Sequence, residues 1–410
     1  MRPFFAMVLA GSIAMPAAAQ FTFTVLPSDT SQSGSWALAR GISGDGKVIV
    51  GGASGLQNTL EKGHVWRSTG SGWARTQLPS QGTPGWGRAL AASHDGDTVV
   101  GMADLVSSGG IVYGTPAVWT DVLSGSPTLT TPLDDTSTKR RGIFSGVSAD
   151  GSRAAGYAGL LPAGSVPLEA WTYAGGSPQQ ISPSGSVNYS STPWVGGNTL
   201  SADGLAFVGT RFDSVGAQKR EAFRWTASGG FQVLPARPTV YTGASAEVIS
   251  ANGNVVGGHV TTSAGGVYNG DGKPTLWING VRLDLALPSN TFNGRVLGLS
   301  ADGSIAAGVQ YNGSVMPIET GLASMDAVVW INNEPFRLSE YLTSRGVDLQ
   351  GIVTRYLMGV SNDGRTLVGY GSVGVSDFNL RSFVVTIPGA GTGTAALAAL
   401  GCVAARRRRG

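Results

Sequence analysis

The chain has 410 residues, of which 63 are glycine and only 13% are charged. Its hydrophobic fraction of 41% suffices for a core, which excludes an intrinsically disordered chain. Without Arg2 and the four arginines near the C-terminal end, 28 − 5 = 23 basic residues face 25 acidic ones, a net charge of −2. A nucleic-acid partner for the body of the chain therefore has no electrostatic support.

Residues 1–19 have the layout of a secretory signal peptide. Arg2 precedes an apolar run from Phe4 to Met15, and small residues then lead to Ala19. This run is too short for a membrane anchor, which needs about 20 apolar residues. We therefore predict an exported protein, cleaved after Ala19 and located outside the cell or at its surface. Its only cysteine, Cys402, lies in the tail, so the body has no disulfide.

A short phrase recurs seven times between residues 20 and 387. It reads apolar residue, Ser, any residue, Asp or Asn, and Gly, with a second Gly five positions after the first. Spacings of 50, 55, 53, 49, 50 and 61 residues between the serines indicate a repeat array. These residue types predict a type I turn followed by Gly at positive φ, which forms a hairpin. The serines are Ser43, Ser93, Ser148, Ser201, Ser250, Ser300 and Ser361.

A tryptophan follows each of the first six turns, and we predict that these rings pack between the units. They are Trp66, Trp119, Trp171, Trp225, Trp277 and Trp330. A further short strand, such as residues 231–235, then ends the unit. Each unit thus has four strands in two hairpins, as a propeller blade does.

The seventh unit lacks its fourth strand, because the repeats stop after residues 382–387. Residues 23–27 at the other end match residues 231–235 in sequence and in distance from the next turn. In a closed ring, the N-terminal strand can fill the place of the fourth strand that the last unit lacks. An open, stacked array does not require such an arrangement. We therefore predict an all-β fold over residues 20–387, a seven-bladed β-propeller of four-stranded blades closed by the N-terminal strand.

The longest spacing contains an insertion that we predict to be a helix. Ser339 is its expected N-cap and Gly346 its expected stop, while Glu340 suits the first turn. Leu338 and Leu342 are expected to face the body.

Residues 388–410 form the tail, in which small apolar residues precede the arginines of residues 406–409. The apolar stretch is marginal for a permanent span, and the arginines after it obey the positive-inside preference. We expect a transient anchor that is cut near Pro388. A helix that stays as a simple C-terminal anchor is the alternative.

The Ser-x-Asp-Gly hairpins, alternating with phrases such as His64-Val65-Trp66 and Glu221-Ala222-Phe223-Arg224-Trp225, resemble the HAF repeats of bacterial extracellular proteins. The resemblance covers residues 21–387 and implies an exported repeat protein, without an activity or site residues. The three-part tail resembles a PEP-CTERM sorting signal, with Pro388-Gly389-Ala390 in place of Pro-Glu-Pro.

The leading functional hypothesis is a monomeric scaffold that binds a partner protein or a polysaccharide without catalysis, with membrane contact only through the tail. The catalytic residues are left unassigned. His64, His94 and His259 lie in different units without metal-ligand spacing, so we predict no metal site and no cofactor.

The alternative is a secreted carbohydrate-active enzyme, a glycoside hydrolase or a lyase. Glycosidic chemistry requires two carboxyl groups roughly 5 to 9.5 Å apart. The carboxylates outside the turns from which such a pair could come are Glu169, Asp213, Glu221 and Asp326. The tryptophans outside the repeat phase, Trp36, Trp86 and Trp194, either stack on sugar rings or pack in the core or at its rim.

Overall fold

The structure is a computed structural model. It describes residues 20–28, 36–54, 61–80, 85–108, 111–133, 140–160, 168–182, 187–190, 197–213, 220–236, 243–261, 272–288, 293–311, 325–374 and 379–388. For residues 104–113, 187–190 and 212–213 only the backbone is considered. The proposed signal peptide and all but the first residue of the proposed tail lie outside the described residues, so both remain predictions.

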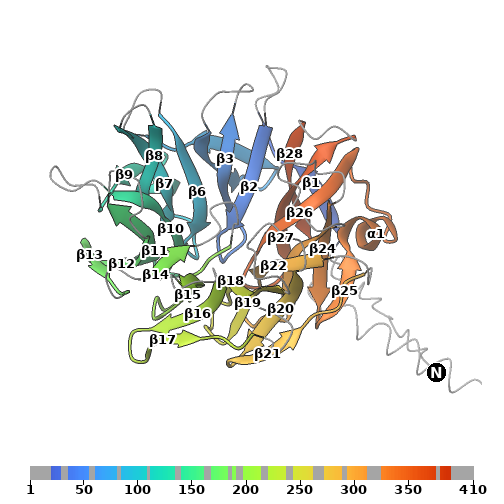
Figure 1. Cartoon of the computed structure of the whole chain (residues 1–410). Helices are drawn as coiled ribbons and strands as arrows, with labels where there is room; N and C mark the ends of the chain where they lie inside the picture. The colour runs from blue at the N-terminus through green and yellow to red at the C-terminus, as the bar shows by residue number, and fades with distance from the viewer. Residues whose placement is uncertain are drawn as a thin grey trace, which may run out of the picture.

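Seven four-stranded antiparallel sheets stand as blades around a central axis, which confirms the predicted seven-bladed propeller (Figure 1). Blade 1 consists of β2 (Trp36–Ile42), β3 (Val48–Ser54), β4 (Lys62–Ser68) and β5 (Trp73–Gln77). Blade 2 consists of β6 (Gly87–Ala92), β7 (Val99–Ser108), β8 (Ile111–Thr120) and β9 (Thr128–Thr130), with the short 3₁₀ turn η1 (Val122–Ser124) between the last two. Blade 3 consists of β10 (Arg140–Val147), β11 (Arg153–Leu160), β12 (Glu169–Ala174) and β13 (Ser177–Gln180).

The remaining blades repeat this order. Blade 4 consists of β14 (Val187–Ser190), β15 (Ala206–Asp213), β16 (Arg220–Thr226) and β17 (Gly230–Val233). Blade 5 consists of β18 (Gly243–Ile249), β19 (Val255–Thr261), β20 (Lys273–Ile278) and β21 (Val281–Asp284). Blade 6 consists of β22 (Asn293–Leu299), β23 (Ile305–Tyr311), β24 (Met325–Ile331) and β25 (Glu334–Arg337). Blade 7 consists of β26 (Ile352–Val360), β27 (Thr366–Val373), β28 (Leu380–Thr386) and the N-terminal strand β1 (Thr22–Val25).

Strand β1 closes the ring, as predicted. It pairs antiparallel with β28, in a register that runs from Thr22 opposite Thr386 to Val25 opposite Phe383. The Phe23 ring stacks on the Phe383 ring with centroids 4.9 Å apart, and both are buried in the core of blade 7. The outermost strand of this blade therefore comes from the opposite end of the chain.

The recurring turns have the predicted geometry. In the first turn the amide of Gly46 donates to the carbonyl of Ser43, while Ser43 Oγ accepts from the amide of Val48 and donates to a carboxylate oxygen of Asp45. The turn glycines have φ between 69° and 82°, a region in which any Cβ is strained. They are Gly46, Gly96, Gly151, Gly204, Gly253, Gly303 and Gly364.

The seven turns are also joined to one another by a closed circle of backbone hydrogen bonds around the axis, which the sequence did not reveal. Each turn donates one amide to the next blade. The bonds run from Asp45 to His94 (2.8 Å), His94 to Ala149 (2.9 Å), Ala149 to Ala202 (2.8 Å), Ala202 to Ala251 (2.9 Å), Asn252 to Ala301 (3.3 Å), Ala301 to Asn362 (3.0 Å) and Asn362 to Gly44 (2.9 Å). We call the face of the ring that carries these turns the turn face.

The innermost strand of six blades carries a β-bulge three residues before the turn serine. The bulged residues, all buried, are Arg40, Leu90, Ser145, Glu247, Leu297 and Met358. In these six blades the second glycine of the phrase lies against the bulge, because a Cβ there would come within 1.9–2.0 Å of a carbonyl oxygen of the innermost strand. This close backbone approach explains Gly51, Gly101, Gly156, Gly258, Gly308 and Gly369.

The in-phase tryptophans tie each blade to the one before it. Trp66, Trp119, Trp277 and Trp330 are buried, and each donates its indole N–H to a carbonyl that follows the outermost strand of the preceding blade. Trp171 is also buried, whereas Trp225 is half-buried. The predicted packing is confirmed, with Trp225 as its loosest member.

Among the described residues, α1 (Leu338–Thr343) is the only α-helix. Leu338 and Leu342 are fully buried as expected, and Gly346 has the positive φ of a helix stop. The prediction that Ser339 caps the helix is wrong, because the helix begins at Leu338, two residues earlier than that cap implies, and Arg337 is its N-cap. Burial of Leu338 draws that residue into the first turn.

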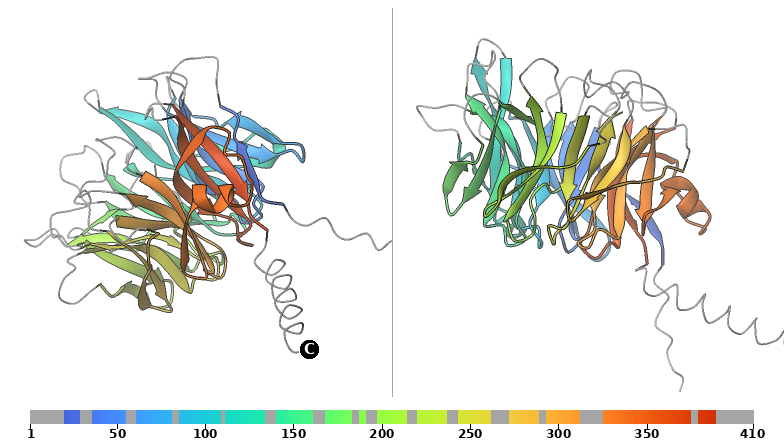
Figure 2. Two further views of the ribbon diagram at one scale, coloured as in Figure 1. Left: turned by 90° about the vertical axis from the view of Figure 1, so that its right-hand side faces the viewer. Right: turned by 60° about the horizontal axis from the view of Figure 1, so that its bottom comes forward.

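The two faces of the ring differ in their connections. The turn face carries the short hairpins, and both described chain ends reach it, because Thr22 pairs with Thr386 there (Figure 2). On the opposite face, the loop face, lie the strand ends flanked by the longer connections, from second to third strand and from blade to blade. In the described segments, no helix has the length and apolar character needed to cross a membrane.

Candidate functional site

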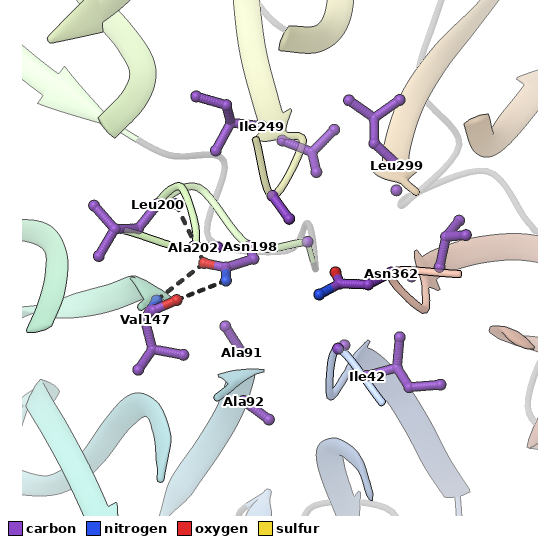
Figure 3. A pocket seen from close by; sticks show the side chains of 18 of the residues that line it. Ile42, Ala91, Ala92, Val147, Asn198, Leu200, Ala202, Ile249, Leu299 and Asn362 are labelled. Atoms are coloured by element: carbon purple, nitrogen blue, oxygen red, sulfur yellow. Dashed lines mark hydrogen bonds between the residues drawn. The ribbon is translucent and has the colours of Figure 1, made fainter. Parts of the chain in front are cut away.

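The axial channel is nearly closed at the turn face. Residues from all seven blades line a cavity of only about 60 Å³ there (Figure 3). Asn198 lies at the edge of this cavity, where its side-chain amide donates to the carbonyl of Val147 in blade 3 and its backbone carbonyl accepts from Ile249 in blade 5 (Figure 3). A dry cavity that admits benzene measures about 150 Å³, so this space excludes a sugar. A sugar enclosed within the channel would therefore lie toward the loop face.

A buried ionic group lies in that direction, where blades 1 and 2 meet. The carboxylate of Glu61, which precedes β4, accepts from Arg40 Nη2 at 2.9 Å and also from Arg88 Nε. The Arg40 side chain is 3% exposed and that of Glu61 is 4% exposed, whereas that of Arg88 is 12% exposed. Arg88 is thus the member of this trio nearest to solvent. Burial, followed by repulsion from Arg40, lowers the pKa of Arg88 although Glu61 opposes the change.

Aromatic rings flank the trio. The Arg88 guanidinium lies 5.2 Å from the centroid of the half-buried Trp86 ring, within the range of a cation–π contact. In blade 7, the Tyr370 ring stacks on that of Tyr356 with centroids 4.8 Å apart. Burial raises the pKa of the Tyr370 hydroxyl, and the charge of Arg40 opposes that rise, so this ring lies within the field of the trio.

A second ionic group joins blades 5 and 6. The Glu247 carboxylate lies 3.3 Å from His259 Nδ1 and 3.9 Å from Arg295 Nη1, and all three side chains are buried. Burial, followed by the charge of Arg295, lowers the pKa of His259 to about 4. His259 is therefore neutral at neutral pH, and the charge of Arg220 acts on it as well as that of Arg295.

The carboxylates considered from the sequence are not brought together by any contact among the described residues. Glu169 pairs with Arg140 at 3.5 Å in blade 3, and Glu221 pairs with Arg211 at 2.6 Å in blade 4. In blade 6, Asp326 accepts from the Gln310 amide at 3.1 Å. The side chain of Asp213 lies outside the described residues. Glu169, Glu221 and Asp326 therefore each contact a residue of their own blade.

The remaining residues considered from the sequence are dispersed. Trp36 is half-buried at the start of β2, Trp86 borders the first ionic group, and Trp194 lies outside the described residues. His64 is buried and His94 lies at the turn face, where its Nδ1 is 3.2 Å from the Asn362 amide nitrogen. Within the described part of the chain, no three metal-ligating side chains gather.

Sequence reasoning missed both ionic groups. A signal existed, since Arg40 and Glu247 stand three residues before a turn serine, where other blades have Leu90, Leu297 and Met358. Charged residues at a position that is uncharged in the other blades indicate ionic contacts near the axis. Their partners Glu61 and His259 come from other strands, which no local pattern could identify.

Each of the two ionic groups contains one carboxylate among the described residues. Glu61 and Glu247 belong to blades 1 and 5 and each contacts a guanidinium, so neither faces a second carboxylate in the manner of a glycosidase pair.

No protein-family model matches the chain, and the comparison with curated proteins found no match either. Among solved structures, an oligogalacturonate lyase from Vibrio parahaemolyticus is 9% identical, with a TM-score of 0.50 over 90% of this chain and 98% of that one. An oligogalacturonate lyase in complex with manganese is 11% identical, with a TM-score of 0.51 over 90% and 97%. TolB from Acinetobacter baumannii is 13% identical, with a TM-score of 0.41 over 71% of this chain and 63% of that one, less than two thirds of its length. At these identities the likeness shows the propeller fold alone.

Proposed function

We propose that the protein is an exported binding scaffold that contacts an extracellular polysaccharide or protein through its loop face. The observation that carries this proposal is the difference between the two faces. The connections between the second and third strands differ in length, from residues 109–110 in blade 2, the shortest, to residues 312–324 in blade 6, the longest. The turn-face hairpins hardly vary, as residues 43–47 and 361–365 illustrate. Variable connections on a rigid frame are where proteins place recognition.

The frame itself is suited to this role. The circle of turn hydrogen bonds, the indole ties between blades and the closing strand β1 hold the strand ends of the loop face in fixed positions. A rigid frame lowers the entropy lost on binding, because few groups must be ordered. Export follows from the layout of residues 1–19 and from the resemblance to HAF repeats, and display at the surface from the PEP-CTERM-like tail.

The experiment measures binding of the purified full chain to immobilised polysaccharides and to extracellular protein from its host. A loop-face variant has the 312–324 connection shortened to four glycines, and a matched turn-face variant carries Lys47→Ala with Arg365→Ala. We expect binding to fall in the first variant and to persist in the second. Loss confined to the turn-face variant contradicts the proposal. Release of shortened sugars during incubation would favour the alternative, a carbohydrate-active enzyme.

A further inference from the structure

We propose that Gln20 is a modification site, at which the glutamine side chain cyclises with its own α-amino group to pyroglutamate and so caps strand β1. This inference rests on the export that the proposed function includes, because cleavage after Ala19 is what makes Gln20 the first residue of the chain. It uses the exposure of Gln20, the groove beside it and the role of β1 in closing the ring.

Cyclisation of an N-terminal glutamine needs no reactant besides the residue itself. The neutral α-amino nitrogen attacks the side-chain carbon Cδ, the bond from Cδ to Nε2 breaks, and ammonia leaves with a proton taken from the amine. An α-amino group has a pKa of about 7.7–8.0, so part of it is neutral near pH 7. The product is a lactam that lacks the terminal positive charge.

Gln20 is placed so that the ring can form without disturbing the sheet. It is exposed, and it precedes Thr22, the first residue of β1, which pairs with Thr386. Among the described residues, no hydrogen bond engages the Gln20 side chain. Cyclisation therefore breaks none of the contacts that hold β1 in blade 7.

A groove of about 660 Å³ lies beside Gln20, between the start of β1 and residues 345–350, which follow α1 at the rim of the ring (Figure 1). A cavity of about 150 Å³ admits benzene, a ring similar in size to the lactam, so the groove has room for the product. Phe21 holds the chain at this place. Its ring meets that of Tyr341 edge-on at 5.9 Å and lies 5.2 Å from the Arg345 guanidinium.

The charges of the groove favour the neutral product. Of the residues that line it, two are charged, Arg345 and Asp348, and their charges cancel. Arg345 is fixed in place, since its guanidinium lies 3.6 Å from the centroid of the Tyr341 ring and its Nη1 donates to the Tyr341 carbonyl at 2.7 Å. A terminal ammonium at Gln20 would add a positive charge to this balanced pair, and cyclisation removes that charge.

The cap protects the strand that closes the ring. Chain ends are where proteolysis concentrates, and an aminopeptidase removes residues one at a time from a free amine. Its third step on this chain would expose Phe23, whose ring stacks on that of Phe383 in the core of blade 7. A lactam offers no free amine, so removal stops before the first residue.

The first measurement is the mass of the N-terminal peptide of the full chain as its host exports it. We expect a peptide that begins at Gln20 and is lighter than its sequence by one ammonia, in a chain that resists aminopeptidase until pyroglutamyl peptidase is added. Gln20→Ala cannot cyclise, so aminopeptidase should shorten it and lower its melting temperature. Gln232→Ala changes an exposed glutamine on β17 and, as the matched control, should keep the resistance.

The second measurement tests the groove. A leader that a specific protease removes just before Gln20 takes the place of residues 1–19, so that cyclisation of the purified chain starts at a known time. Near pH 7, Arg345→Gln should slow the loss of ammonia about twofold and Asp348→Asn should speed it about twofold, because a nearby cation disfavours the protonated amine and a nearby anion favours it. Thermal melting establishes that both variants are folded.

An exported chain that begins at Gln20 and keeps its ammonia overturns this inference and leaves the proposed export standing. Equal rates of cyclisation in the two groove variants overturn the placement of the amine beside Arg345 and Asp348. An exported chain that still begins at Met1 instead contradicts the cleaved signal peptide on which the proposed export rests.

Discussion

The indole Nε1 of Trp66 donates a 2.8 Å hydrogen bond to the carbonyl oxygen of Pro27, and this bond crosses the seam at which the ring closes. The same bond joins Trp277 to Pro235 inside the ring at 2.9 Å. The seam between the two chain ends is thus bonded like an ordinary contact between consecutive blades.

Trp66→Phe should lower the free energy of unfolding by about 1 kcal/mol beyond its loss of packing, because the part-buried hydrogen bond from the indole to the Pro27 carbonyl is lost. Trp277→Phe should cost a similar amount, since its geometry is the same. Denaturant titration of both variants tests this. A cost at Trp277 with none at Trp66 would mean that the seam is loose in solution.

A chain that begins at Asp29 should be strongly destabilised, because it lacks β1. Phe23 and Leu26 are buried, and each contributes roughly 1.5–3 kcal/mol of hydrophobic burial. The edge of β28 also loses its partner. Thermal melting measures the effect, and a synthetic peptide of residues 20–28 added in excess should restore part of the stability. Unchanged melting of the truncated chain would contradict closure by β1.

Two glycines of one phrase should respond differently to alanine. At Gly258 an added Cβ would lie 2.0 Å from the carbonyl oxygen of Ser245, so the backbone must move. At Gly253 the nearest atom is 3.5 Å away and only the positive φ resists, a cost of about 1–2 kcal/mol. We expect Gly258→Ala to be the more destabilising variant. The reverse order of their denaturation midpoints would refute the bulge contact.

Stability should fall as the pH drops from about 6.5 to about 4. Burial lowers the pKa of His64 and of His259 to about 4, against roughly 6.5 in an unfolded chain. Between these values the unfolded chain binds protons that the folded chain excludes, so acidification favours unfolding and the effect levels off below pH 4. Melting temperatures measured across this range test the slope. The double variant His64→Gln, His259→Gln should show a smaller slope, and an unaltered slope would show that these histidines are not responsible.

Most of the fold could be predicted because its signals recur in phase. The turn glycines, the in-phase tryptophans and the closing strand each follow from residue types at a fixed spacing. Blade 4 is present as predicted, but its innermost strand is irregular: β14 ends at Ser190, and Leu200 before the turn forms an isolated bridge with Phe207. The predicted helix cap at Ser339 is wrong because burial of Leu338 in the first turn outweighs the preference of a serine side chain for the N-cap.

The ionic groups were hidden for a different reason. Glu61 precedes Arg88 by 27 residues and belongs to another blade. The two meet only because the ring places the third strand of one blade beside the first strand of the next. A contact of this kind depends on the angle between blades, which residue spacing does not encode. The position of a charged residue in an innermost strand could be noticed, but not its partner.

The pairing of Thr22 with Thr386 has a mechanical consequence. Both described ends of the chain leave the ring side by side at the turn face. A tether attached to either end would hold the turn face toward the point of attachment, so that the loop face points outward. Tension on such a tether would load β1 and β28 in shear along their shared ladder, so that several hydrogen bonds resist together rather than opening one at a time.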